Sequence, residues 1–250
     1  MKKRNSALAR VPTVEIDSKM EAGEPTAVGR VQRRQKKTRI RLLKAGYGLI
    51  TEKGIDETTI MEITDAADVG FGTFYNYFSS KDDIAMQILD CVVHALGVRS
   101  DAVNEANDVD DPVLTIANSV RLTAHAMMDD PMWKSWLKRT DLMVQRMRDV
   151  FKPFGIRDMQ RAVDAGMYHI PNDNLESAWS LHIWLLTGKI TDIAHGYCLP
   201  ESEMQMCESI MRMMGVDKAK ARAVSIVPLP DAPPLRIDFS YVHETEKGDE

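Results

Sequence analysis

Residues 58–81 read TTIMEITDAADVGFGTFYNYFSSK, and this stretch decides the fold. Thr59, followed three residues later by Glu62, is a capping box, the pattern that begins a helix. Apolar residues follow at helical spacing until Asp, Val and Gly at 68–70 interrupt them. A second helix is predicted over about residues 71–78. Two short helices joined by a tight polar turn are typical of a helix-turn-helix.

The second of these helices has two different faces. Phe74 and Phe78 are four residues apart and are predicted to face their own domain. The remaining side chains are mostly small or polar, as the major groove of DNA requires. Thr and Tyr hydroxyls, a helix N-terminus and Lys81 are groups that bind phosphates. Each of these residues alone would more often be a packing residue, but the spaced set predicts DNA as the partner.

The segment before the helix-turn-helix is basic. A first helix is predicted over about residues 31–53, with Gly54 as its C-cap. Residues 1–41 contain 12 Lys or Arg against 4 acidic residues, and the remaining 209 contain 20 against 33. A basic segment on an acidic body indicates that nucleic acid is met at one end. The basic side chains predicted to bind DNA are Arg33, Arg34, Lys36 and Lys37.

This N-terminal region resembles the tetracycline-repressor (TetR) family over about residues 36–90. The residues that support the resemblance are Gly54, Thr59, Ala66, Gly72-Thr73-Phe74-Tyr75, Tyr77-Phe78 and Lys81. The resemblance implies an all-α fold, with an N-terminal three-helix helix-turn-helix head and a C-terminal helical domain for ligand binding and dimerisation. It also implies a transcriptional regulator that binds a palindromic operator in double-stranded DNA as a homodimer.

The resemblance also implies which residues contact DNA. Phosphate contacts are implied at Thr59, Thr73, Tyr75, Tyr77 and Lys81, and base-facing positions at Ile60, Phe71, Gly72 and Asn76. The chain departs from the family where Asp68 replaces the usual Gly of the turn and Gly70 replaces a Ser or Thr cap. Asp adopts left-handed backbone more readily than most residues, and Gly is an acceptable cap, so we expect the fold to tolerate both. Because the base-facing positions offer few hydrogen bonds, specificity is expected to depend on Asn76, on Phe71 against thymine methyls and on DNA shape.

The rest of the chain is predicted to be helical up to its C-terminal tail. The helix that begins after Ser80 is expected to leave the head and enter a second domain. Later helices are predicted over about residues 112–128, 131–150, 155–168, 175–195 and 201–214. The predicted division is a disordered basic arm at 1–29, a DNA-binding head at 30–80, an effector-binding and dimerisation domain at 81–224 and an extended, Pro-rich tail at 225–250.

Two consecutive helices, at 175–195 and 201–214, are apolar on more than one face. Their apolar residues repeat in steps of three and four, which is a coiled-coil-like seam. A domain of this size cannot cover all of these faces, so a second copy is predicted to cover them in a four-helix bundle. The predicted dimer interface consists of Trp179, Ile183, Leu186, Ile190, Ile193, Met204, Cys207, Met211 and Met214.

Met, Trp and His residues are dense between positions 125 and 184. They can line an adaptable apolar pocket, although each alone is more often plain core. The predicted pocket residues are His125, Met128, Trp133, Trp136, Met143, Met147, Tyr168, His182 and Trp184. The leading hypothesis is a repressor released by a small hydrophobic or aromatic effector. The alternative is a DNA-binding dimer whose second domain has no small-molecule effector and only dimerises or binds a protein partner.

Other functional classes leave no trace in the sequence. We find no Gly-rich phosphate loop, no His or Cys cluster at metal spacing and no nucleophile elbow, so no enzyme activity, cofactor or metal is expected. The three cysteines fit neither a disulfide framework nor a zinc site and suit a reducing cytoplasm. No apolar run approaches the roughly 20 residues that span a bilayer, and no apolar segment follows the basic residues 2–4. A cytoplasmic protein without membrane contact is therefore predicted.

Overall fold

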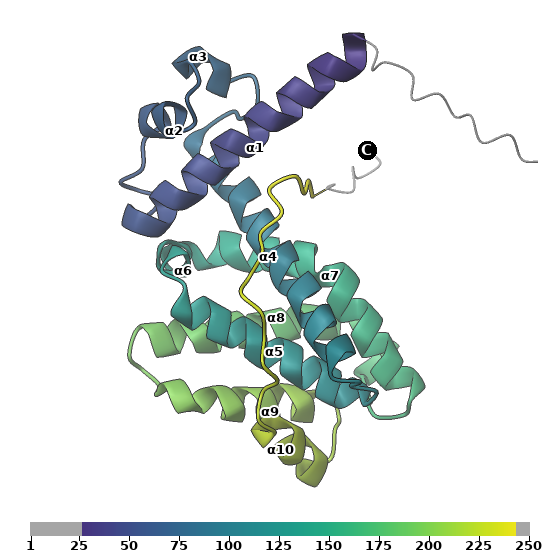
Figure 1. The fold of residues 1–250 in the computed structure, drawn as a ribbon. Helices are drawn as coiled ribbons and strands as arrows, with labels where there is room; N and C mark the ends of the chain where they lie inside the picture. The colour runs from purple at the N-terminus through teal and green to yellow at the C-terminus, as the bar shows by residue number, and fades with distance from the viewer. Residues whose placement is uncertain (1–26, 244–250) are drawn as a thin grey trace, which may run out of the picture.

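The structure, a computed structural model, describes residues 27–243. It is all-α, as predicted, with no β-strand among the described residues (Figure 1). A small head contains α1 (Ala27–Lys53), α2 (Ile60–Ala66) and α3 (Phe71–Phe74), and a larger body lies below it in the figure. The body contains α4 (Lys81–Ala106), α5 (Pro112–Asp129), α6 (Met132–Trp136), α7 (Thr140–Asp164), α8 (Leu175–Ala194), α9 (Glu203–Met213) and α10 (Lys218–Ile226), with 3-10 turns at Leu137–Arg139, Pro171–Asp173 and Pro200–Ser202.

One apolar core under the helix-turn-helix holds the head together. Phe74 and Phe78 are buried in it, as predicted. The predicted capping box is also present: the Thr59 hydroxyl accepts a hydrogen bond from the Glu62 amide, and the Glu62 carboxylate accepts one from the Thr59 amide. In the turn, Asp68 has a φ of 50°, the left-handed conformation that Asp tolerates. The helix-turn-helix therefore forms from local signals that can be recognised in the sequence.

Two helix boundaries in the head differ from the prediction. α1 begins at Ala27, so residues 27–29 are helical although the disordered arm was predicted to reach residue 29. The rest of that arm lies outside the described residues. α3 ends at Phe74, and a tight turn in which the Phe78 amide bonds the Phe74 carbonyl replaces its predicted second half. This turn still buries both phenylalanines, so the packing requirement is met with fewer helical residues.

The helix α4 belongs to both head and body. It begins at Ser80, whose hydroxyl accepts a hydrogen bond from the Asp83 amide at 3.0 Å. Near its start, Ile84 and Ile88 belong to the core and lie close to Gly46 of α1. The same helix then continues between α5 and α7 (Figure 1). This helix therefore connects the packing of the body directly to the head.

The region from residue 131 to 168 is organised differently from the prediction. A short α6 and a 3-10 turn occupy residues 132–139, and one long helix, α7, then runs without a break through Pro153 and Gly155. Pro inside a helix costs about 3 kcal/mol. The cost is offset because α7 buries apolar residues on both sides of the proline, including Met147, Phe151 and Met159.

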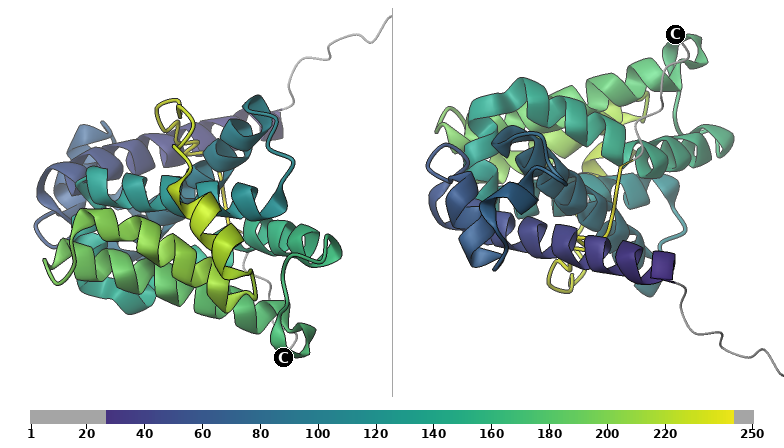
Figure 2. Two further views of the ribbon diagram at one scale, coloured as in Figure 1. Left: turned by 90° about the horizontal axis from the view of Figure 1, so that it is seen from below. Right: turned by 90° about the horizontal axis from the view of Figure 1, so that it is seen from above.

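The C-terminal segment contains a helix that the sequence reading missed. α10 begins after Asp217, whose carboxylate caps it by accepting from the amides of Ala219 and Lys220. From Val227 to His243 the chain has no helix, and it passes along the outside of the body from α10 back to α1 (Figure 2). The extended tail therefore begins two residues later than predicted, and it returns to the head.

Two glycines allow aromatic rings to approach the helices of the body closely. A Cβ on Gly97 of α4 would lie 2.7 Å from the Phe154 ring, and one on Gly155 of α7 would overlap the Trp179 ring. Real Cβ atoms do not approach neighbours so closely. Phe154 and Trp179 can therefore occupy their places only because both positions lack a side chain.

Gly155→Ala is expected to lower the free energy of unfolding by about 1–3 kcal/mol, because overlap with Trp179 outweighs the gain in helix propensity of about 1 kcal/mol. Gly48→Ala in α1 is the control, since a Cβ there would meet nothing within 4 Å. That control should raise the free energy of unfolding by up to about 1 kcal/mol. Urea unfolding measures both, and stabilisation by both substitutions would contradict the close packing.

Candidate functional site

The exposed face of the head is formed by α2, α3 and the residues that follow α3. Met61, Phe71 and Tyr75 keep 60%, 49% and 53% of their surface exposed, and the rings of Phe71 and Tyr75 are 5.8 Å apart. Gly72 and Asn76 are also exposed. Apolar side chains gathered on an open surface mark a binding site, and these come from both helices of a helix-turn-helix and the residue that follows the second. Met61 was not among the predicted residues.

A cleft of about 460 Å³ lies beside this face, between α1 and α3. Its lining residues are Gln32, Gln35, Lys36, Arg39, Asn76 and Tyr77. Two cations with amide and phenol groups suit the phosphate backbone of a nucleic acid. Sequence reasoning selected Lys36, Asn76 and Tyr77 but missed the others. The signal was present, because the four α1 residues recur in steps of three, one and three, which places them on one helical face.

Several other predicted DNA-binding residues already have partners in the head. The Thr59 hydroxyl donates to the Glu62 carboxylate at 2.8 Å, and the Lys81 ammonium donates to the Asp56 carbonyl at 3.0 Å. Hydrogen bonds from Lys53 and Thr59 lower the pKa of Glu62 to about 2. Ile60, Thr73 and Tyr77 are half-buried, whereas Arg33, Arg34 and Lys37 are exposed on α1 but do not line the cleft. Their roles toward DNA remain predictions.

The body supports the head from below through polar contacts. Arg139, next to α6, donates to Asp56 of the head at 2.9 Å and to Asp82 of α4 at 2.7 Å. The Ser135 hydroxyl accepts a hydrogen bond from the Ile55 amide, and the Tyr47 hydroxyl of α1 donates to Asp130. The position of the head therefore depends on the corner between α5 and α7.

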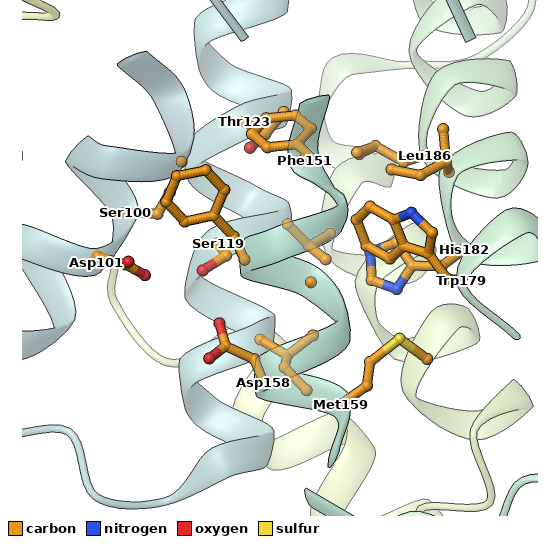
Figure 3. A pocket seen from close by; sticks show the side chains of 16 residues that line it. Ser100, Asp101, Ser119, Thr123, Phe151, Asp158, Met159, Trp179, His182 and Leu186 are labelled. Carbon is orange, nitrogen blue, oxygen red and sulfur yellow. The ribbon is translucent and has the colours of Figure 1, made fainter. Parts of the chain in front are cut away.

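A cavity of about 60 Å³ lies in the body between α4, α5, α7 and α8 (Figure 3). Its apolar walls include Phe151, Phe154, Met159, Trp179 and Leu186, and its small lining residues are Gly97, Ser100, Ser119 and Gly155. The Trp179 ring is fixed because its Nε1–H donates to the Arg148 carbonyl at 2.9 Å. The cavity therefore has an aromatic wall held by a specific hydrogen bond.

Among the polar side chains that line this cavity, His182 and Asp158 are buried and have shifted pKa values. His182 is buried, its Nδ1 has no hydrogen-bond partner, and burial lowers its pKa to about 4. Its ring is therefore uncharged at neutral pH. Asp158 is also buried, which raises its pKa, and it accepts a hydrogen bond from Arg157 at 2.9 Å. An uncharged imidazole and a carboxylate in an apolar wall can both bond a hydroxyl group.

Most of the predicted pocket residues lie elsewhere. Of the nine, only His182 lines the cavity. Trp133, Trp136, Met143, Met147 and Tyr168 are buried but do not line it, Met128 is partly buried, and His125 and Trp184 are exposed. Density of Met and Trp identified core, because the sequence does not show which helix faces meet. The glycines at 97 and 155, within helices, were the available signal for unusual packing.

The predicted dimer interface is corrected in a similar way. Trp179, Ile183, Leu186, Ile190, Cys207, Met211 and Met214 are buried within the protomer, where α8 packs on α7 and α9. A second copy could not cover side chains that have no free surface. Ile193 and Met204 retain exposed surface. The seam is real, but it joins helices of one chain.

The opposite face of α8 is the exposed one. Leu181, Trp184 and Leu185 keep 52%, 48% and 39% of their surface exposed, and Met204 of α9 lies at 39%. Their spacing of three and four places the α8 residues on one stripe. An apolar stripe of this kind marks an interaction surface.

Metal binding and membrane spanning find no support in the described part of the chain. Residues 27–243 contain no group of three or more His, Cys, Asp or Glu that could hold a metal ion. None of their helices is long and apolar enough to cross a membrane.

Comparison with known proteins matches both parts of the chain. Residues 42–88 match the family of bacterial regulatory proteins, tetR family, and residues 111–226 match the tetracyclin repressor-like C-terminal domain. The HTH-type transcriptional regulator TcmR of Streptomyces glaucescens is 28% identical over 83 residues, which are 33% of this chain and 37% of that protein. The chain thus matches little more than a third of this relative's length.

Solved structures resemble nearly the whole fold. The crystal structure of RolR in complex with resorcinol has a TM-score of 0.72 and 25% identity, covering 81% of this chain and all of that one. RolR without ligand has a TM-score of 0.69, with 77% of this chain and 99% of that chain covered at 25% identity. With a helix-turn-helix head and a C-terminal helical domain that both match, the chain belongs to the TetR family of bacterial regulatory proteins.

Proposed function

We propose that this protein is a homodimeric transcriptional repressor that a small hydroxylated aromatic molecule releases from its operator. The observation that carries the proposal is that α4 both completes the head and lines the cavity of the body. A ligand that moves α4 changes the spacing of the two heads of a dimer. DNA reads that spacing, because half-sites of a palindrome are separated by about 34 Å, one helical turn.

The chemistry of the cavity supports the effector class. Its wall is largely aromatic, and its lining includes both an unpartnered nitrogen of His182 and the carboxylate of Asp158. RolR was crystallised with resorcinol, a benzene ring with two hydroxyl groups. A ring needs a cavity on the order of 150 Å³, whereas this one measures about 60 Å³. Entry of a ring therefore requires the walls to separate, which is the displacement that the release mechanism needs.

The small cavity also favours the alternative, a DNA-binding dimer without a small-molecule effector. In that case the body only dimerises or binds a protein partner. A screen of phenols for release of bound DNA decides between the two functions. The operator itself can be obtained by selecting bound fragments from a random DNA pool.

The head surface supports a specific docking geometry. The segment with Phe71, Gly72 and Asn76 would enter the major groove, and the cleft with Lys36 and Arg39 would receive the adjacent phosphates. The exposed stripe of Leu181, Trp184 and Leu185 would join α8 of two copies.

Lys36→Ala is expected to weaken binding to all DNA sequences. It should also make the negative slope of log affinity against log salt less steep by about 1 for each protomer, because one phosphate contact is lost. Lys218→Ala, at the start of α10 and far from the head (Figure 1), should leave the slope unchanged. Titration of a selected fragment at several salt concentrations measures this. An unchanged slope for Lys36→Ala would remove the cleft from the DNA interface.

Trp184→Glu is expected to convert the dimer to a monomer and to weaken operator binding by about tenfold or more, since one head then binds one half-site. Val98→Glu on α4 is the matched control, because Val98 is equally exposed at 48% but lies outside the stripe. Sedimentation velocity and DNA titration give the two readouts. A Trp184→Glu protein that remains dimeric would place the interface elsewhere.

Resorcinol is the first probe of the cavity, and it is expected to raise the melting temperature and weaken DNA binding. Asp158→Asn and His182→Leu should each weaken the affinity for resorcinol by about tenfold, which corresponds to the loss of one hydrogen bond in a buried site. Asp164→Asn, exposed on the same helix as Asp158, is the control. Calorimetric titration measures the affinity. Full binding by both cavity variants would mean that the ligand binds elsewhere.

A further inference from the structure

The tail at residues 227–243 is a feature that the family match does not cover, since the C-terminal domain match ends at residue 226. The tail leaves α10 at one end of the body and reaches α1 at the other (Figure 1). It therefore forms a second connection between body and head, covalent at α10 and non-covalent at α1, in addition to α4.

The first end of the tail is fixed to the core of the body. Arg121 of α5 and Glu203 of α9 are both buried and form an ion pair at 3.2 Å. The same guanidinium donates to the Val227 carbonyl, where the tail begins. Beyond this point a hollow of about 480 Å³ lies between residues 229–235 and α5.

The far end of the tail is bound to both α4 and the head. The Tyr241 ring stacks on His94 of α4, with centroids 3.9 Å apart and planes at 14°. Phe239 is buried, and its ring lies 5.6 Å from that of Tyr47 in α1. The carbonyls of both tail residues accept hydrogen bonds from Arg39 of α1 at 3.5 Å. The tail is thus fixed at both ends, and between them Leu235 and Ile237 are partly buried against the core.

These contacts continue to the two functional regions. His94 lies 5.7 Å from the Phe154 ring, which forms part of the cavity wall and packs over Gly97. At the other side, Arg39 lines the cleft between α1 and α3. A bound ligand whose ring separates Phe154 from Gly97 would therefore displace His94 and then Tyr241. That displacement would reach the Arg39 guanidinium, which lines the proposed phosphate site.

We propose that residues 227–243 are a strap that holds the head in one orientation on the body and transmits effector binding through Phe154, His94 and Tyr241 to Arg39. The transmission rests on the proposed function, but the holding of the head does not. Loss of the strap frees the head to adopt several orientations, and the DNA-competent one is then less populated.

The first test needs neither DNA nor effector. Spin labels at Met61→Cys in α2 and Lys218→Cys in α10, in a Cys198→Ser background diluted with unlabelled protein, report the distance between head and body. Tyr241→Ala, and a chain ending at Pro228, should each broaden the distance distribution about twofold. Tyr241→Phe keeps the stacked ring and should match the parent, as should Val242→Ala. Equal widths in all variants would overturn the strap.

The second test measures affinity for the selected DNA fragment. Tyr241→Ala should weaken binding about three- to tenfold, and the release caused by resorcinol should shrink by a similar factor. Stronger DNA binding by Tyr241→Ala would show that the tail instead competes with phosphate for Arg39, and would overturn the proposal. A parent that binds no DNA would refute the proposed function, while the distance measurement still decides the strap.

Discussion

The structure depends on one constraint: α4 is a single uninterrupted helix that head and body share. Its first turns, with Ile84 and Ile88, pack against α1, and its later residues Gly97 and Ser100 line the cavity of the body. A helix is stiff over this length, because each residue is tied to the next turn by a backbone hydrogen bond. The packing of the head and that of the body are therefore coupled. The other contacts between head and body restrict the orientations that the head can adopt at the end of α4.

The head could be predicted from sequence because its determinants are local. The capping box of Thr59 and Glu62, the left-handed Asp68 and the burial of Phe74 and Phe78 all lie within 20 residues. Local hydrogen bonds and short-range packing specify such a unit whatever surrounds it. What could not be read was the cleft, since it requires knowing that one face of α1 passes beside the end of α3.

The body shows what periodicity leaves undetermined. The pattern of α8 correctly predicts two apolar faces, but it assigns neither to a partner. In the structure the Trp179 face packs inside the protomer, because Gly155 admits its ring, and the Trp184 face remains exposed. That choice depends on a glycine in another helix. The cavity likewise arises from four helices that are distant in sequence, so density of Met and Trp identified only core.

The small cavity has a consequence for how such a protein would be tuned. A molecule entering it would find only about 60 Å³ of empty space, and it would compete with the rings of Phe154 and Trp179 for the rest. The threshold concentration for the proposed response would then depend on how well those rings pack on Gly97 and Gly155 as much as on contacts with the entering molecule. If the proposed effector binds here, its potency would change through substitutions that never touch it, while selectivity would depend on His182 and Asp158.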